Sequence, residues 1–126
     1  MHSRSIPALI RRDADISLGP SPDIGQIEWL ARRRGFRALL DLDEEGEPGQ
    51  TLSPNVAASW AHTFGLMHER VPISLERPGE ADVERFLAVL RALPKPVYVH
   101  SAHGARAAAL VARWFAAAPL SPSGAA

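Results

Sequence analysis

The sequence contains no cysteine. Disulfide bonds, thiolate metal sites and thiol catalysis are therefore excluded for this chain. It also lacks a surplus of charge, with 14 Lys and Arg against 14 Asp and Glu, so nothing indicates a general nucleic-acid or membrane-surface binder. No apolar run approaches the roughly 18 residues that span a bilayer, and residues 1–12 lack the apolar core of a signal peptide. We therefore expect a cytoplasmic protein with neither nucleic-acid nor membrane partners.

What the sequence does contain is enough for one domain. Its 126 residues suffice for a single core and are too few for two. Residues 1–14 are polar and basic apart from one small apolar patch, and we expect them to be flexible. Residues 15–119 then form an α/β domain, and 120–126 form a disordered tail of small residues.

Apolar periodicity alternates between strand and helix along the domain. We expect strands at 15–19, 36–42, 66–73 and 97–100. Helices follow them between Ser21 and Gly35, between Ser53 and Gly65, over 83–93 and over 106–118, with Ser21 as an N-cap and Pro22 as a first helical residue. The alternation predicts a three-layer fold, in which helices flank a four- to five-stranded, mostly parallel sheet.

The last strand leads through a short loop into the last helix. The loop comprises Ser101, Ala102, His103, Gly104, Ala105 and Arg106. Its backbone N–H groups, at a helix N-terminus and beside a guanidinium, predict a site for phosphate or another oxyanion. The loops 43–51 and 74–79 also follow strands, so all three are expected at the same edge of the sheet, where open α/β folds bind ligands.

Several stretches, in this order, support a family resemblance. They are Ser21-Pro22, Gly35-Phe36-Arg37-Ala38-Leu39-Leu40, Gly46-Glu47-Pro48-Gly49-Gln50, Val71-Pro72-Ile73 and His100-Ser101-Ala102-His103-Gly104-Ala105-Arg106-Ala107. Over about residues 15–118 the chain resembles the protein tyrosine/dual-specificity phosphatase superfamily. Within it, the chain is most similar to the small bacterial phosphatase-like domain found beside or fused to β-lactamase-like hydrolases.

The resemblance implies roles for particular residues. Ser101 stands where the family has its Cys nucleophile, and Arg106 stands where an Arg holds the phosphoryl oxygens. Glu76 or Asp82 is the candidate for the general acid. His100 is expected to support the loop by hydrogen bonding. No cofactor and no metal are implied.

Two reactive positions depart from the family pattern. Ser101 replaces the nucleophile, and a hydroxyl would need a general base beside it. Ala107 replaces the Ser or Thr that assists the leaving thiolate. Relatives often carry an Arg at the exit of the second strand, whereas this chain has a run of carboxylates there, Asp41, Asp43, Glu44 and Glu45. We therefore expect an inactive or weak pseudophosphatase that binds a phosphorylated ligand or protein partner.

Other interpretations stay open at the level of sequence. Ser101 can simply cap the last helix, Arg106 can pair with a carboxylate, and Asp82 suits the first turn of any helix. The alternatives for function are an active phosphoric-monoester hydrolase, a Cys-to-Ser variant of one, and a rhodanese-like domain. A metal-binding module is a further alternative, with ligands from His100, His103, Asp41 and Asp43. The sequence does not set the oligomeric state.

Overall fold

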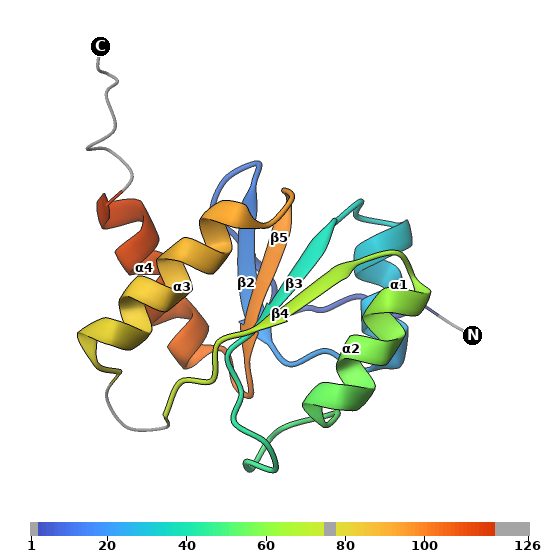
Figure 1. Cartoon of the computed structure of the whole chain (residues 1–126). Helices are drawn as coiled ribbons and strands as arrows, with labels where there is room; N and C mark the ends of the chain where they lie inside the picture. The colour runs from blue at the N-terminus through green and yellow to red at the C-terminus, as the bar shows by residue number, and fades with distance from the viewer. Residues whose placement is uncertain (1–2, 75–77, 118–126) are drawn as a thin grey trace.

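A computed structural model describes residues 3–74 and 78–117 (Figure 1). Its strands are β1 (Ile10–Arg11), β2 (Ile16–Pro20), β3 (Ala38–Asp41), β4 (Met67–Arg70) and β5 (Val97–Ser101). Its helices are α1 (Ile24–Arg32), α2 (Pro54–Thr63), α3 (Glu80–Ala92) and α4 (Ala105–Ala117). The predicted alternation is confirmed, and β1 is added to it.

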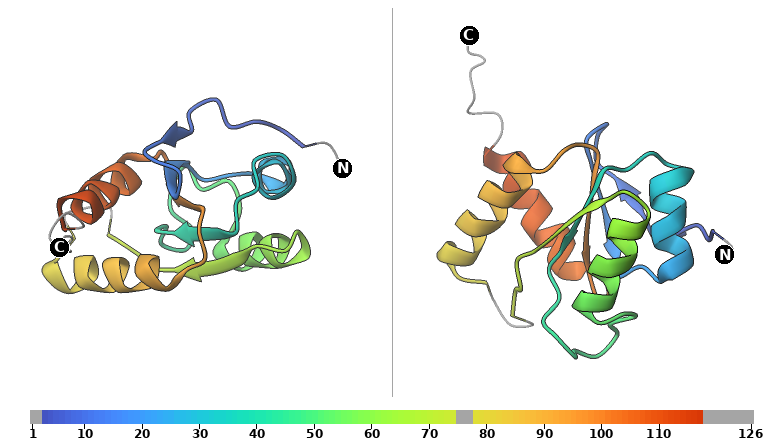
Figure 2. Two further views of the ribbon diagram at one scale, coloured as in Figure 1. Left: turned by 90° about the horizontal axis from the view of Figure 1, so that it is seen from above. Right: turned by 45° about the vertical axis from the view of Figure 1, so that its right-hand side comes forward.

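The strands form one sheet in the order β1-β2-β5-β3-β4. All neighbours are parallel except β1, which pairs antiparallel with β2. Figure 2 shows α3 and α4 together on one side of the sheet and α1 and α2 on the other. The predicted three-layer, mostly parallel α/β fold is therefore confirmed. Within the described residues, no helix is long and apolar enough to cross a membrane.

Side chains of the central strands alternate between two separate hydrophobic cores, one on each face of the sheet. Leu40 and Val99 point toward α3 and α4, whereas Leu39 and Tyr98 belong to the core under α1 and α2. This is the two-residue period of a strand that is covered on both faces. Side chains that share a face with Leu39 and Tyr98 therefore lie on the α1–α2 side.

Tyr98 crosses to the neighbouring strand at Gly19. Its hydroxyl donates a hydrogen bond to the Pro20 carbonyl over 2.6 Å. A Cβ on Gly19 would lie 2.5 Å from that same hydroxyl oxygen. The absence of a side chain at Gly19 is what lets the ring reach β2.

The start of α1 differs from the prediction. The helix begins at Ile24, and Asp23 rather than Ser21 is the N-cap. The Asp23 carboxylate accepts from the Gln26 N–H over 2.8 Å, and the Gln26 side chain accepts from the Asp23 N–H over 2.9 Å. This reciprocal capping box satisfies two backbone donors. The Ser21 hydroxyl instead donates to the carboxylate of Asp43. By contrast, Ser53, which bounds the second expected helix, is the N-cap of α2.

The described part of the segment expected to be flexible, 1–14, contributes to the fold. Ile6 is 4% exposed and packs in the core under α1 and α2. The pair Ile10–Arg11 lies against Ser17 and Leu18 of β2. The strand expected over 66–73 is shorter, because only Met67–Arg70 pairs with β3. The tail expected over 120–126 lies outside the described residues.

Candidate functional site

The loop between β5 and α4 is tightly turned. Ser101 ends the strand, and its carbonyl accepts a hydrogen bond from the Gly104 N–H over 3.2 Å. Gly104 has a φ of +91°, a conformation that side chains disfavour. A Cβ there would also lie 3.3 Å from the backbone of Gly19. The loop thus takes the compact form that the sequence predicts between strand and helix.

The Ser101 side chain is used within the protein. It is 1% exposed, and its Oγ accepts a hydrogen bond from the Ala107 N–H over 3.1 Å. Ala107 lies in the first turn of α4, whose leading N–H groups have no partner inside the helix. Among the described residues, no histidine or carboxylate is hydrogen bonded to this hydroxyl. The geometry is that of a helix cap.

Arg106 faces protein acceptors on three sides. Its guanidinium forms a two-pronged ion pair with Glu47, one hydrogen bond of which measures 3.0 Å. It donates to the Ile73 carbonyl over 2.8 Å and approaches the Leu42 carbonyl at 3.5 Å. The side chain is only 12% exposed. Arg106 therefore ties the helix to the segments that follow β3 and β4.

Two buried carboxylates surround that guanidinium. Asp43 lies 3.7 Å from Arg106, and the hydrogen bond from Ser21 partly offsets the burial that raises the pKa of Asp43. Burial alone would also raise the pKa of Glu47. The hydrogen bonds from Arg106 and the Glu44 N–H, with the Arg106 charge, outweigh burial and lower it. The positive charge of Arg106 is thus largely neutralised by Glu47 and Asp43 of the same chain.

The Gly46–Gln50 turn lies directly against the loop. The exposed His103 places its imidazole where a Cβ of Gly49 would be. Gly49 itself has a φ of +84°. With the Glu47 ion pair, this contact brings together two of the three loops predicted to converge.

The third predicted loop is only partly described. Glu76, one candidate for the general acid, lies outside the described residues. Asp82, the other, accepts from the Gly79 N–H over 3.1 Å and from Arg85 over 2.9 Å. The first contact lies in the first turn of α3, and Arg85 follows one turn further along the helix. Asp82 thus has the capping position that any helix start favours.

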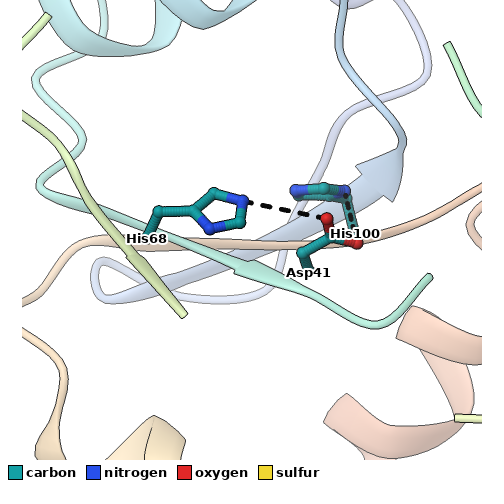
Figure 3. Close-up of side chains that lie close together, drawn as sticks. All are labelled: Asp41, His68 and His100. Carbon is teal, nitrogen blue, oxygen red and sulfur yellow. Dashed lines mark ion pairs between the residues drawn. The ribbon is translucent and has the colours of Figure 1, made fainter. Parts of the chain in front are cut away.

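Asp41 lies next to two histidines, His68 and His100, and is the partner of both (Figure 3). The carboxylate of Asp41 is 3.8 Å from His100 Nδ1 and 3.7 Å from His68 Nε2. Neither ring nitrogen of His100 has a hydrogen-bond partner among the described residues, so the expected hydrogen bond from His100 to the loop is absent. The metal set envisaged from sequence is also regrouped: within the described residues the cluster is Asp41, His68 and His100, without His103 or Asp43.

Fold and loop together define a phosphatase-like α/β domain of the tyrosine and dual-specificity type. Residues 11–120 match the family described as a DSP-PTPase phosphatase fused to NAD+ kinase. The chain belongs to that family. No curated protein matches it.

Solved structures share the fold at low sequence identity. A DUF442 protein from Shewanella putrefaciens CN-32 is 20% identical, with a TM-score of 0.79 over 91% of this chain and 71% of the other. PTPMT1, solved in complex with PI(5)P, is 23% identical, with a TM-score of 0.69 over 86% and 71%. A Cys-to-Ser variant of TpbA from P. aeruginosa, solved with phosphotyrosine, is 18% identical, with a TM-score of 0.71 over 94% and 70%.

Two residues of the site were not singled out from the sequence. Glu47 belongs to the Gly46–Gln50 stretch that supports the resemblance, but nothing in the sequence marked it as the partner of Arg106. His68 was hidden in an edge strand whose pairing partner the sequence does not reveal. Strand register supplies the missing signal, because Leu39 lies opposite both His68 and Tyr98, and Asp41 lies opposite His100.

Proposed function

We propose that this protein is a pseudophosphatase, which binds a phosphate or another oxyanion through the loop 101–106 and turns it over slowly or not at all. The ligand is a phosphorylated small molecule or a phosphoprotein. The observation that carries the proposal is the buried Ser101 hydroxyl, which accepts the Ala107 N–H and, among the described residues, is hydrogen bonded to no histidine or carboxylate. A bacterial, cytoplasmic setting belongs to the same proposal, in keeping with the bacterial proteins that share the fold.

Backbone geometry supports oxyanion binding. The N–H groups of Ala105 and Arg106 open α4 and have no acceptor inside the helix. They point toward the loop, where the helix dipole favours negative charge. Arg106 adds a guanidinium, which is the side chain best suited to phosphate.

The carboxylates around Arg106 limit the affinity. Glu47 occupies the fork of the guanidinium, and Asp43 lies behind it. A phosphate dianion approaching the loop meets both negative charges in a partly buried setting, where Coulomb interactions are stronger than in water. We therefore expect weak binding of free inorganic phosphate, with tighter binding of ligands that gain contacts outside the loop.

A matched set of four proteins tests the proposal. Wild type, Ser101→Cys, Arg106→Lys and Arg113→Lys are compared for phosphate binding by NMR titration and for hydrolysis of p-nitrophenyl phosphate. Arg113 lies on the same helix in an exposed ion pair with Glu80 and serves as the control. We expect binding in wild type and Arg113→Lys, weakening of about tenfold in Arg106→Lys, and no turnover by wild type.

The Ser101→Cys variant distinguishes loss of the nucleophile alone from loss of further groups that catalysis needs. Turnover by this variant would show that only the nucleophile is missing. Continued inactivity would implicate Ala107, the carboxylates or the absence of an acid as well. Hydrolysis by wild type that disappears in a Ser101→Ala variant would overturn the proposal in favour of an active hydrolase.

A further inference from the structure

Three adjacent strands present potential metal ligands on one face of the sheet. Asp41 and His100 are direct partners across β3 and β5. His68 on β4 lies opposite Leu39, two residues before Asp41, and therefore projects to the same side. That side is the one covered by α1 and α2, and Figure 3 shows the His68 ring pointing along the sheet toward the other two side chains.

The potential ligand atoms of the cluster lie near one another. One ligand atom from each residue can be chosen so that all lie within 4.8 Å of one another, and the two pairs between Asp41 and the histidines measure 3.7 and 3.8 Å. Around a tetrahedral metal bound at about 2.0–2.1 Å, ligand atoms lie about 3.3–3.4 Å apart. Metal binding would therefore draw the three side chains closer together.

Three ring nitrogens of the two histidines make no hydrogen bond within the described residues. Within the described residues, His68 Nε2 and both ring nitrogens of His100 are buried without a hydrogen-bond partner. The side chains of His68 and His100 are 6% and 2% exposed. Leaving several buried polar atoms unpaired is costly. A metal ion shared by the cluster would engage one nitrogen of each ring.

The carboxylate of the cluster is held in place by a neighbouring backbone group. Asp41 is oriented by the Asp43 N–H, which donates to its carboxylate over 2.9 Å. Near Asp41, the positive charge of Arg70 has a larger effect than the negative charge of Glu47.

We propose that Asp41, His68 and His100 form a binding site for a first-row transition-metal dication, for which Zn²⁺ is the probe. Two imidazoles and one carboxylate are typical ligands for such ions, and they leave one position for water. The site is distinct from the oxyanion loop, because it uses side chains on the α1–α2 face of the sheet. One of its ligands, His100, directly precedes Ser101 on β5. Metal binding would therefore stiffen the strand that leads into the loop.

Titration of the EDTA-treated full chain with Zn²⁺ tests the site. Calorimetry is expected to give one ion per chain, and Co²⁺ is expected to give the visible absorption of a low-coordinate site. His68→Gln should weaken Zn²⁺ binding by about 100-fold, because it removes one ligand of three. A double variant, His62→Gln with His103→Gln, is the control, since both of these histidines are exposed.

NMR of the histidine rings in the wild-type protein tests the site without relying on a variant that could misfold. In wild type, ¹⁵N-detected NMR of the imidazoles should show His68 and His100 shifting on addition of one equivalent of Zn²⁺, while His62 and His103 stay in place. The proposal fails if no ion binds, if His68→Gln binds as tightly as wild type, or if the shifts occur at the exposed histidines. Phosphate binding measured on metal-free protein reports separately on the oxyanion loop.

Discussion

The contact between Arg106 and Glu47 determines how the loop is held. The Arg106 guanidinium is hydrogen bonded to the Glu47 carboxylate and to the Ile73 carbonyl. These contacts hold the loop in place without any ligand. Removing the Glu47 carboxylate leaves Arg106 with the Ile73 carbonyl and the more distant Asp43. Removing the guanidinium leaves Glu47 buried without its cation, so either change costs more than losing an exposed ion pair. The family resemblance implies an anion-binding role for Arg106, and the contact adds a structural one.

The first prediction concerns the pH dependence of stability. Because the folded-state pKa of Glu47 is lowered from 4.5, its contribution to the free energy of unfolding is complete above that pH. The contribution is lost as the pH falls through the folded-state pKa. Glu47→Gln should therefore be less stable than wild type at pH 7, and the difference should shrink below pH 4.5. Urea unfolding at both pH values measures it, and a difference that stays constant would contradict the prediction.

Some of these residue roles follow from sequence and some do not. That Ser101 caps the last helix and that Asp82 lies in a first helical turn could be predicted, because both effects are local in the chain. The choice of Glu47 as the partner of Arg106 could not, because it depends on how a turn 59 residues away folds over the loop. The grouping of His68 with Asp41 and His100 depends on strand register in the same way.

Helix starts show how local chemistry competes at the scale of an element. Two candidate caps precede α1, Ser21 and Asp23, and both are residues that favour this position. Asp23 is the cap because Gln26 completes the capping box with it. Ser21 is then free to hydrogen bond with Asp43. At α2 the cap is Ser53, the residue directly before Pro54, and its hydroxyl accepts from the Val56 N–H over 3.4 Å.

The second prediction is that Asp23→Ala destabilises the protein by about 1 kcal/mol, the usual effect of losing an N-cap. Asp23→Ser should recover most of that stability, since its hydroxyl can accept the same N–H. Chemical denaturation of the three proteins gives the comparison. If the Ser variant were as unstable as the Ala variant, the nearby ion pair between Arg4 and Asp23 would be the dominant contribution instead.

At the scale of the whole molecule, the sheet separates two cores, and the N-terminal segment helps to close one of them. Ile6 packs beside residues of α1 and α2, and the Arg4 N–H donates to the Gly25 carbonyl over 3.0 Å. The alternating pattern predicted both helical layers correctly. It missed this contribution, because a two-residue strand and a single buried Ile leave no periodicity.

The third prediction compares two isoleucines of that segment. Ile6 is 4% exposed and Ile10 is 53% exposed. Ile6→Ala should cost about 2 kcal/mol or more in the free energy of unfolding, whereas Ile10→Ala should cost less than about 0.5 kcal/mol. Thermal and urea unfolding of both variants would show the contrast. Equal, small effects would mean that the segment is flexible, as the sequence first indicated.

The close fit of Tyr98 over Gly19 has an evolutionary consequence. A methyl group at Gly19 and a hydroxyl at Tyr98 would occupy the same space. Drift at one position therefore constrains drift at the other: an Ala at Gly19 becomes admissible only in a lineage that has already exchanged Tyr98 for a smaller side chain. Among descendants of this sequence, the two positions are expected to change as a pair and in that order.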